Sequence, residues 1–182
     1  MSETPSPSTV TPARLARHAL LFGGIAGVLG SLWMLFEFGL AQRGVASSSG
    51  RYLEFAGMLI PIGATLYGLM RWRDGVLGGT IRFQQAFGVA LGIGLVFAAI
   101  LAAFSYLYVS AINPSLIEAA IQQHAEALRQ AGKTAEEIAK QTELDRAAFT
   151  PGVFAYQFFS RGLVTAGVIS FAASLLIRKR PL

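Results

Sequence analysis

The sequence contains no cysteine and few charged residues, and each shortage excludes classes of protein. Without cysteine there can be no disulfide, thiolate metal site or cysteine nucleophile. Charged residues make up 14% of the 182-residue chain and hydrophobic residues 53%, whereas an ordinary soluble domain carries about 25% charged residues. The composition is therefore typical of a membrane protein.

Acidic residues are fewer than basic ones, and the formal net charge is +5. In a soluble protein this excess would suggest a nucleic acid partner, but here the basic residues flank hydrophobic runs. Anionic lipid headgroups are the expected counter-charge, so we predict no nucleic acid partner. The partners we predict are the lipid bilayer, a protein partner and, as a further option, other copies of the chain.

The common catalytic motifs are also missing. The sequence has no phosphate loop, dinucleotide fingerprint, HExxH motif or nucleophile elbow. His124 has no second histidine near it, and a metal site needs three or four clustered ligands, so we expect His124 to be a packing residue. We therefore predict that the protein is not an enzyme and binds no metal or cofactor.

One long uncharged stretch dominates what is present. Residues 83–117 lie between Arg82 and Glu118 and contain no Asp, Glu, Lys or Arg. A helix needs about 20 apolar residues to cross a bilayer core of about 30 Å. We therefore predict a transmembrane helix within this stretch.

Three other stretches also predict transmembrane helices. Residues 19–36 are uncharged. Residues 55–70 are interrupted by Pro61, which is expected to kink the helix, and neighbouring helices in a membrane can accommodate such a kink. Thr150-Pro151 is expected to cap the last helix, which runs to Ile177. The predicted fold class is all-α, with four spans at about 18–40, 53–70, 84–110 and 153–177.

The N-terminal stretch allows a second interpretation. Residues 1–12 contain three prolines and predict a disordered tail. Arg14 and Arg17 then precede the apolar run, and Gly39-Leu40-Ala41 resembles a signal-peptidase site. The run exceeds the roughly 7–15 apolar residues of a signal peptide, so we prefer a first transmembrane helix.

Between the third and fourth spans the sequence predicts an extramembrane helical hairpin at about 115–148. Ser115 with Glu118, and Thr134 with Glu137, have the spacing of capping boxes. Apolar residues recur at helical spacing in the first helix, and Gly132 ends it. This acidic, amphipathic segment either binds a protein partner or lies against its own membrane domain, which we expect to comprise residues 13–182.

The basic residues predict the topology. In a four-span arrangement most of them fall on one side of the membrane: Arg14, Arg17, Arg71, Arg73, Arg82, Arg178, Lys179 and Arg180. By the positive-inside rule we expect both termini in the cytoplasm and the hairpin outside.

Three ionisable residues form a candidate intramembrane polar site: Glu37, Glu54 and Arg161. Such residues are functional candidates by default, but these lie near the predicted span ends. A structural ion pair or anchoring at the interface is therefore the preferred interpretation, and a proton or substrate relay is the alternative.

Two further sets are predicted. Three arginines beside Trp72 and Phe83 are candidate headgroup-binding residues, with general interfacial anchoring as the alternative: Arg71, Arg73 and Arg82. Small residues that recur every fourth position predict close helix packing: Gly23, Gly27, Ala90, Gly94, Ala98, Gly162, Ala166 and Ser170.

Two segments resemble a known family. They are Arg73-Asp74 through Gly79-Thr80-Ile81-Arg82-Phe83-Gln84-Gln85-Ala86-Phe87-Gly88, and Tyr108 through Asn113-Pro114-Ser115-Leu116-Ile117-Glu118. The chain is similar in them to a bacterial membrane family known as domain of unknown function 4199. It differs at Arg82, where serine is usual, and at Gln84, where glycine is usual. The resemblance implies four spans, a charged hairpin and a basic tail in a bacterial membrane protein, and implies no activity. We predict that this membrane is the inner (cytoplasmic) membrane.

The leading functional hypothesis is a non-enzymatic membrane accessory or scaffold protein that binds a protein or lipid partner. The alternative is a small oligomeric transporter or channel subunit with Glu37, Glu54 and Arg161 as its polar site. A sensor whose hairpin reports envelope conditions is a third hypothesis.

Overall fold

The computed structural model describes residues 11–42 and 46–177; the side chains of residues 41, 42, 46–51 and 54 are outside this description. The predicted tail at residues 1–12 therefore lies almost entirely outside the described residues, as do Arg178, Lys179 and Arg180. Within the described residues the regular structure is helical. The prediction of an all-α fold is confirmed.

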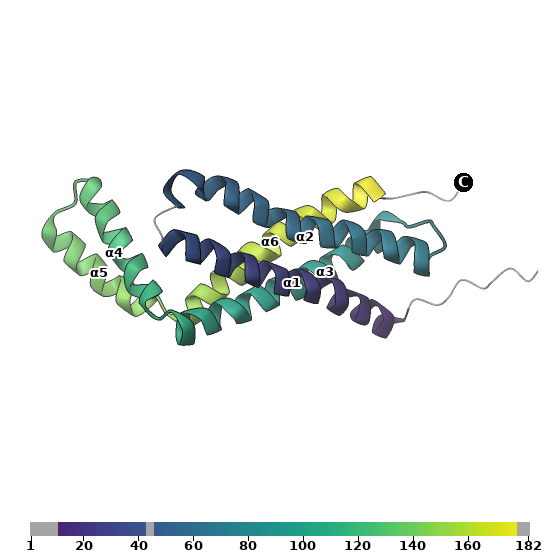
Figure 1. Cartoon of the computed structure of the whole chain (residues 1–182), viewed down its shortest axis with the longest axis horizontal. Helices are drawn as coiled ribbons and strands as arrows, with labels where there is room; N and C mark the ends of the chain where they lie inside the picture. Colours follow the sequence, from purple (N-terminus) through teal and green to yellow (C-terminus); the bar gives the residue numbers. More distant parts are fainter. Residues whose placement is uncertain (1–10, 43–45, 178–182) are drawn as a thin grey trace, which may run out of the picture. The chain divides into compact units, whose positions relative to one another are not determined.

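The helices follow one another with short connections (Figure 1). In chain order they are α1 (Pro12–Gln42), α2 (Ala46–Val76), α3 (Phe83–Leu107), the π-helical segment η1 (Tyr108–Ile112), α4 (Ser115–Gln130), α5 (Ala135–Ala148) and α6 (Pro151–Ile177). They form two compact units. The first unit contains residues up to 101 and from 160 onward, and the second contains residues 102–159.

Three of the described helical segments are long and apolar enough to cross a membrane: Pro12–Leu40, Phe83–Ile112 and Pro151–Ile177. Membrane-length helices are thus confirmed at three of the four predicted places. Helix α2 is as long as α1, at 31 residues each, but is less apolar and contains Pro61. The span predicted at 53–70 stays a prediction.

In the first unit, α1 packs against α3 at glycines. A Cβ atom added at Gly23 would lie 2.5 Å from the Ile93 carbonyl oxygen, and one added at Gly27 would lie 2.7 Å from Ile100 Cβ. No side chain fits at such separations, so glycine allows the two backbones to approach closely.

Helix α6 packs against α3 in the same way and runs antiparallel to it. A Cβ atom at Gly162 would lie 2.9 Å from Ala98 Cβ, and Gly94 is in close contact with Ala166. Residue numbers in these contacting pairs rise along α6 as they fall along α3, which is why the two helices are antiparallel.

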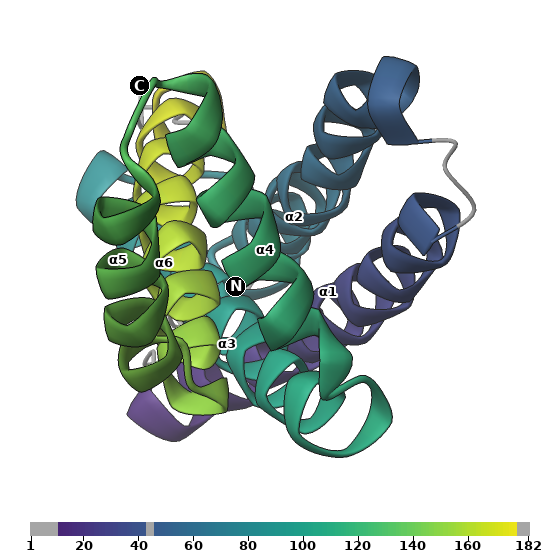
Figure 2. The ribbon, with the colours of Figure 1, turned by 90° about the vertical axis from the view of Figure 1, so that its left-hand side faces the viewer.

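Helices α1 and α2 lie side by side (Figure 2). His18 Nε2 lies 2.9 Å from the Gly68 carbonyl oxygen, and the His18 ring packs between Phe22 and Trp72. Further along the pair, Gly57 faces the Trp33 ring, because a Cβ at Gly57 would lie 2.7 Å from Trp33 Nε1.

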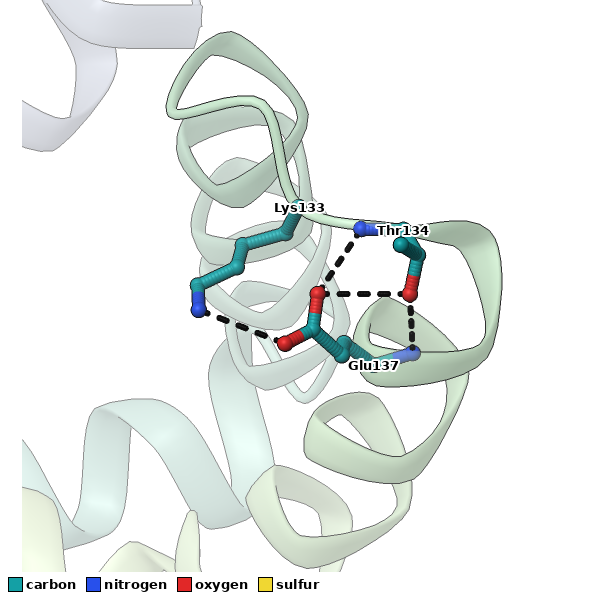
Figure 3. A network of polar contacts seen from close by, with 3 residues as sticks. All are labelled: Lys133, Thr134 and Glu137. Carbon is teal, nitrogen blue, oxygen red and sulfur yellow. Dashed lines mark hydrogen bonds and ion pairs between the residues drawn. The ribbon is translucent and has the colours of Figure 1, made fainter.

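In the second unit, α4 and α5 pack against each other. Gly132, with φ of 76°, ends α4 in the left-handed region that glycine favours. Thr134 and Glu137 then form the predicted capping box at the start of α5, and Lys133 adds an ion pair to Glu137 (Figure 3). At α6, the Val153 N–H donates to Thr150 Oγ1 at 3.3 Å, which confirms the cap predicted there.

The capping box predicted at Ser115 and Glu118 is wrong. The residue that precedes α4 is Pro114, whose dihedral angles of −62° and −24° are already helical and whose side chain makes no cap. Ser115 therefore lies inside the first turn, and its hydroxyl donates to Asn113 Oδ1 at 2.6 Å instead.

Candidate functional site

Three helix ends meet at one end of the first unit: the start of α1, the end of α2 and the start of α3. They share a core cluster in which Ala19, Trp72 and Val89, one from each helix, are buried. The His18 contact with Gly68 and the packing of Ala19 against Gly92 hold these ends together. The result is a small apolar assembly built from three segments of the chain.

A mostly apolar groove of about 240 Å³ lies in this assembly, and we call it the Trp72 groove. Its lining residues come from all three helices and the loop after α2: Leu15, Trp72, Leu77, Gln84, Gln85, Gly88 and Val89. Gly88 is exposed, and a Cβ atom built on it would meet nothing within 4 Å. The groove therefore has free space beside Gly88.

The three arginines predicted to bind headgroups belong to the same helix ends. Arg71 is exposed and precedes Trp72 in the sequence. Arg82 is exposed as well and lies three residues before Gln85. Arg73 forms a two-point ion pair with Asp74, in which its Nε and Nη2 donate at 2.7 and 3.1 Å. Arg73 is therefore partly neutralised, while Arg71 and Arg82 present their charges to the surroundings.

Two arginines that are not in the headgroup prediction belong to the same helix ends. Arg14 and Arg17 are exposed on the first turns of α1, on either side of the groove residue Leu15. Their signal in the sequence was the same basic clustering that was used only for topology. Leu15 and Gly88, by contrast, carry no local signal, because the groove arises only when three distant segments meet.

Two residues of the predicted polar set, Glu37 and Arg161, have described side chains, and these two do not pair. Glu37 is half-buried on α1 and accepts a hydrogen bond from Trp33 Nε1 at 2.8 Å, whereas Arg161 is exposed on α6. No ion pair between Glu37 and Arg161 occurs among the described side chains, and the side chain of Glu54 lies outside them. The transport hypothesis therefore stays a prediction without a geometric argument.

All eight predicted packing residues are buried, from Gly23 on α1 to Ser170 on α6. Six of them lie at the glycine contacts that bring α1 and α6 close to α3: Gly23, Gly27, Gly94, Ala98, Gly162 and Ala166. Ala90 is fully buried on α3, and the Ser170 hydroxyl is buried without a hydrogen-bond partner among the described atoms. These residues position the helices that carry the groove.

The second unit has its own polar centre, between α4 and α5. His124 Nδ1 lies 2.6 Å from Asp145 Oδ2, and Gln141 Nε2 donates to Asp145 Oδ1 at 3.1 Å. Burial raises the pKa of Asp145, but the hydrogen bonds from Gln141 and His124 outweigh it and leave that pKa lowered. His124, expected to be a packing residue, therefore forms a polar contact between the two helices.

A wide groove runs between α4 and α5, lined by exposed residues of both charges, among them Glu118, Glu126, Arg129, Glu143 and Arg146. Arg146 Nη2 donates to Glu118 Oε1 at 2.9 Å across the helix pair. The lining also includes apolar residues such as Ile121, Ala125 and Ile138, so the groove has the mixed character of a protein-binding surface. The described residues include no cluster of three metal-ligating side chains.

Fold and geometry thus define an all-α protein with helices apolar enough to cross a membrane and two grooves of different chemistry. The chain belongs to the family described as "Protein of unknown function (DUF4199)", whose family model matches residues 21–179. A search of curated proteins and a search of solved structures each found no match to the chain.

Proposed function

We propose that the protein is a non-enzymatic accessory or scaffold of the bacterial inner membrane, which binds a protein partner through the groove between α4 and α5. The observation that carries this proposal is the division of surface character between the two units. Large apolar side chains are exposed along α1 and α6, such as Leu32, Val164 and Val168 at 56, 70 and 66%. The α4–α5 groove has a mixed lining instead, in which charged residues of both signs stand among apolar ones.

The exposed apolar side chains argue for lipid contact. Soluble monomers rarely expose contiguous apolar patches larger than a few hundred Å², and side chains of this kind recur over the length of both helices. Phe55 and Leu59 on α2 are 62 and 67% exposed as well, and α2 lies along α1. On this basis α2 is the fourth span, and the positive-inside rule then gives cytoplasmic termini and an exterior α4–α5 pair.

The α4–α5 pair is suited to binding because its geometry is fixed by several polar links. The contacts of Asp145 with His124 and Gln141, the Arg146–Glu118 ion pair and the capping box at Thr134 all hold one relative position of the two helices. A preorganised surface loses less conformational entropy on binding than a mobile one. A partner with matching charges would therefore bind without ordering this unit first.

Replacing single alanines by arginine tests the groove, because each of the two helices has an exposed alanine inside the groove and another outside it. Ala119 on α4 and Ala139 on α5 are exposed and line the groove, while Ala127 and Ala147 are exposed on the same helices outside it. Purification in mild detergent at native expression, with mass spectrometry of copurifying proteins, should show one stoichiometric partner for the unsubstituted chain. Ala119→Arg and Ala139→Arg should lose it, and Ala127→Arg and Ala147→Arg should keep it.

Two results would contradict the proposal. One is a chain that purifies without any stoichiometric protein partner, and the other is equal partner loss from the groove variants and their controls. Circular dichroism of all four variants checks that the arginines leave the helices intact.

A further inference from the structure

We propose that the Trp72 groove and the arginines around it form a binding site for one anionic phospholipid, whose acyl chain occupies the groove and whose phosphate faces the arginines. The proposal rests on membrane insertion of the first unit, as argued above. It does not depend on the α4–α5 partner. It extends the headgroup prediction by adding an acyl-chain site and two further arginines.

The charge around the groove is the first argument. Five arginines lie at these helix ends: Arg14, Arg17, Arg71, Arg73 and Arg82. Asp74 is the only acidic residue in the segments 11–36 and 55–117, and it pairs with Arg73. The remaining positive charges have no acidic counterpart in these segments, which is the complement of a phosphate group. Anionic lipids attract each such residue by about 1 kcal/mol, or about fivefold in affinity.

The shape and lining of the groove are the second argument. A bound free phosphate would require polar groups on all sides, but this groove is lined by Leu15, Trp72, Leu77 and Val89, with two glutamine side chains. Gln85 Oε1 accepts a hydrogen bond from the Arg82 backbone N–H at 3.2 Å, so the amide oxygen of Gln85 already has a partner. Apolar walls beside exposed arginines match a lipid, which joins an acyl chain to a phosphate.

The depth of the site is the third argument. The groove lies at the helix ends whose arginines are predicted to lie at the cytoplasmic interface, and a tryptophan in its wall is typical of that depth. A phospholipid of the inner leaflet has its phosphate and its first methylene groups at the same depth. The geometry therefore favours a lipid of the inner leaflet.

The test uses Trp72 as the reporter, because the chain has only two tryptophans, Trp33 and Trp72. The Trp33→Phe chain is reconstituted in phosphatidylcholine vesicles that contain phosphatidylglycerol or phosphatidylcholine with brominated acyl chains. Bromine quenches a nearby indole, so a specific site should give stronger quenching by brominated phosphatidylglycerol at equal mole fraction. Unlabelled phosphatidylglycerol should reverse this excess.

Matched variants locate the site. Gly88→Leu should fill the groove and abolish the excess quenching, whereas Gly63→Leu, on α2 with open space around its Cβ position, should retain it. Arg71→Gln and Arg82→Gln should each weaken the apparent affinity about fivefold. Arg161→Gln removes the same charge from α6 and is the control, which should leave the affinity unchanged. The neighbouring Gly162 packs on Ala98, and Ala98 lies about 24 Å along α3 from Arg82, so Arg161 is far from the groove.

Equal quenching by the two brominated lipids would overturn the lipid site, as would unchanged quenching in Gly88→Leu. If Trp33→Phe does not fold, mass spectrometry can measure the phosphatidylglycerol that copurifies with each chain instead. The unsubstituted and Gly63→Leu chains should retain this lipid, and Gly88→Leu should lose it. A chain that does not float with vesicles would instead contradict the membrane insertion on which both proposals depend.

Discussion

At Asp145, burial and hydrogen bonding act on one carboxyl group in opposite directions. The residue is 6% exposed, which disfavours its charged form, yet it accepts hydrogen bonds from Gln141 and lies 2.6 Å from His124 Nδ1. The net effect is a lowered pKa. The ionised carboxylate therefore stabilises the contact between α4 and α5.

The lowered pKa of Asp145 makes the stability of the α4–α5 contact depend on pH. Because the pKa of Asp145 is lower in the folded chain than in the unfolded chain, its contribution to stability is fully present above pH of about 4 and is lost as the pH falls through the folded value. Hydrogen exchange of the α4 and α5 amides, corrected for intrinsic rates, should show protection that decreases below this pH.

Asp145→Asn should lower the protection of α4 and α5 at neutral pH and make its decrease with acid shallower. Glu143→Gln, an exposed carboxylate on the same helix, is the control and should keep the acid dependence of the unsubstituted chain. Identical pH profiles for Asp145→Asn and the unsubstituted chain would show that this carboxylate does not link the helices.

At the scale of the helices, neighbouring glycines on α1 have different surroundings. A Cβ atom at Gly23 would collide with the Ile93 carbonyl oxygen and Val96 of α3, while one at Gly24 would meet nothing within 4 Å. Gly23→Ala should destabilise the first unit by about 1–3 kcal/mol, the usual cost of overpacking. Gly24→Ala should be neutral or should stabilise it by up to about 1 kcal/mol, through helix propensity.

Thermal unfolding in detergent, followed by circular dichroism, compares the two variants directly. A lower midpoint for Gly23→Ala alone is the expected result. Equal midpoints for both would mean that α1 and α3 do not approach closely at Gly23.

The sequence predicted those features of the helices that are encoded locally. Every fourth residue of a helix returns to nearly the same face, so the spacing of Gly23 and Gly27 could indicate a packing seam. The capping box at Thr134 and Glu137 is likewise a property of four consecutive residues. The same spacing misled at Ser115, because a capping residue lies just before the helix and Ser115 is already the first residue of α4.

The candidate sites depend on contacts between distant residues, and these the sequence could not supply. His124 and Asp145 are 21 residues apart, so no local pattern indicated their contact. The Trp72 groove combines Leu15, Trp72 and Gly88 from three helices. Of the groups around this groove, the sequence indicated only Arg71, Arg73 and Arg82, because basic clustering is visible without any long-range contact.

At the scale of the whole molecule, the proposals share one premise, which is that four helices cross the membrane. The helices α1, α3 and α6 are apolar and long enough, and α2 decides the topology. With α2 across the membrane, the arginine-rich helix ends are cytoplasmic and the α4–α5 pair is exterior. Without it, the same rule applied to α1 would place α4 and α5 in the cytoplasm.

Labelling of single cysteines in intact cells tests this premise most directly, since the chain contains no cysteine of its own. Gln130 at the end of α4 and Gly75 near the end of α2 are both exposed, so cysteine at either position should leave the fold unchanged. With a membrane-impermeant maleimide, we expect Gln130→Cys to be labelled from outside and Gly75→Cys to be labelled only after the cells are opened. The reverse pattern, with Gly75→Cys labelled in intact cells and Gln130→Cys protected, would contradict the four-span account.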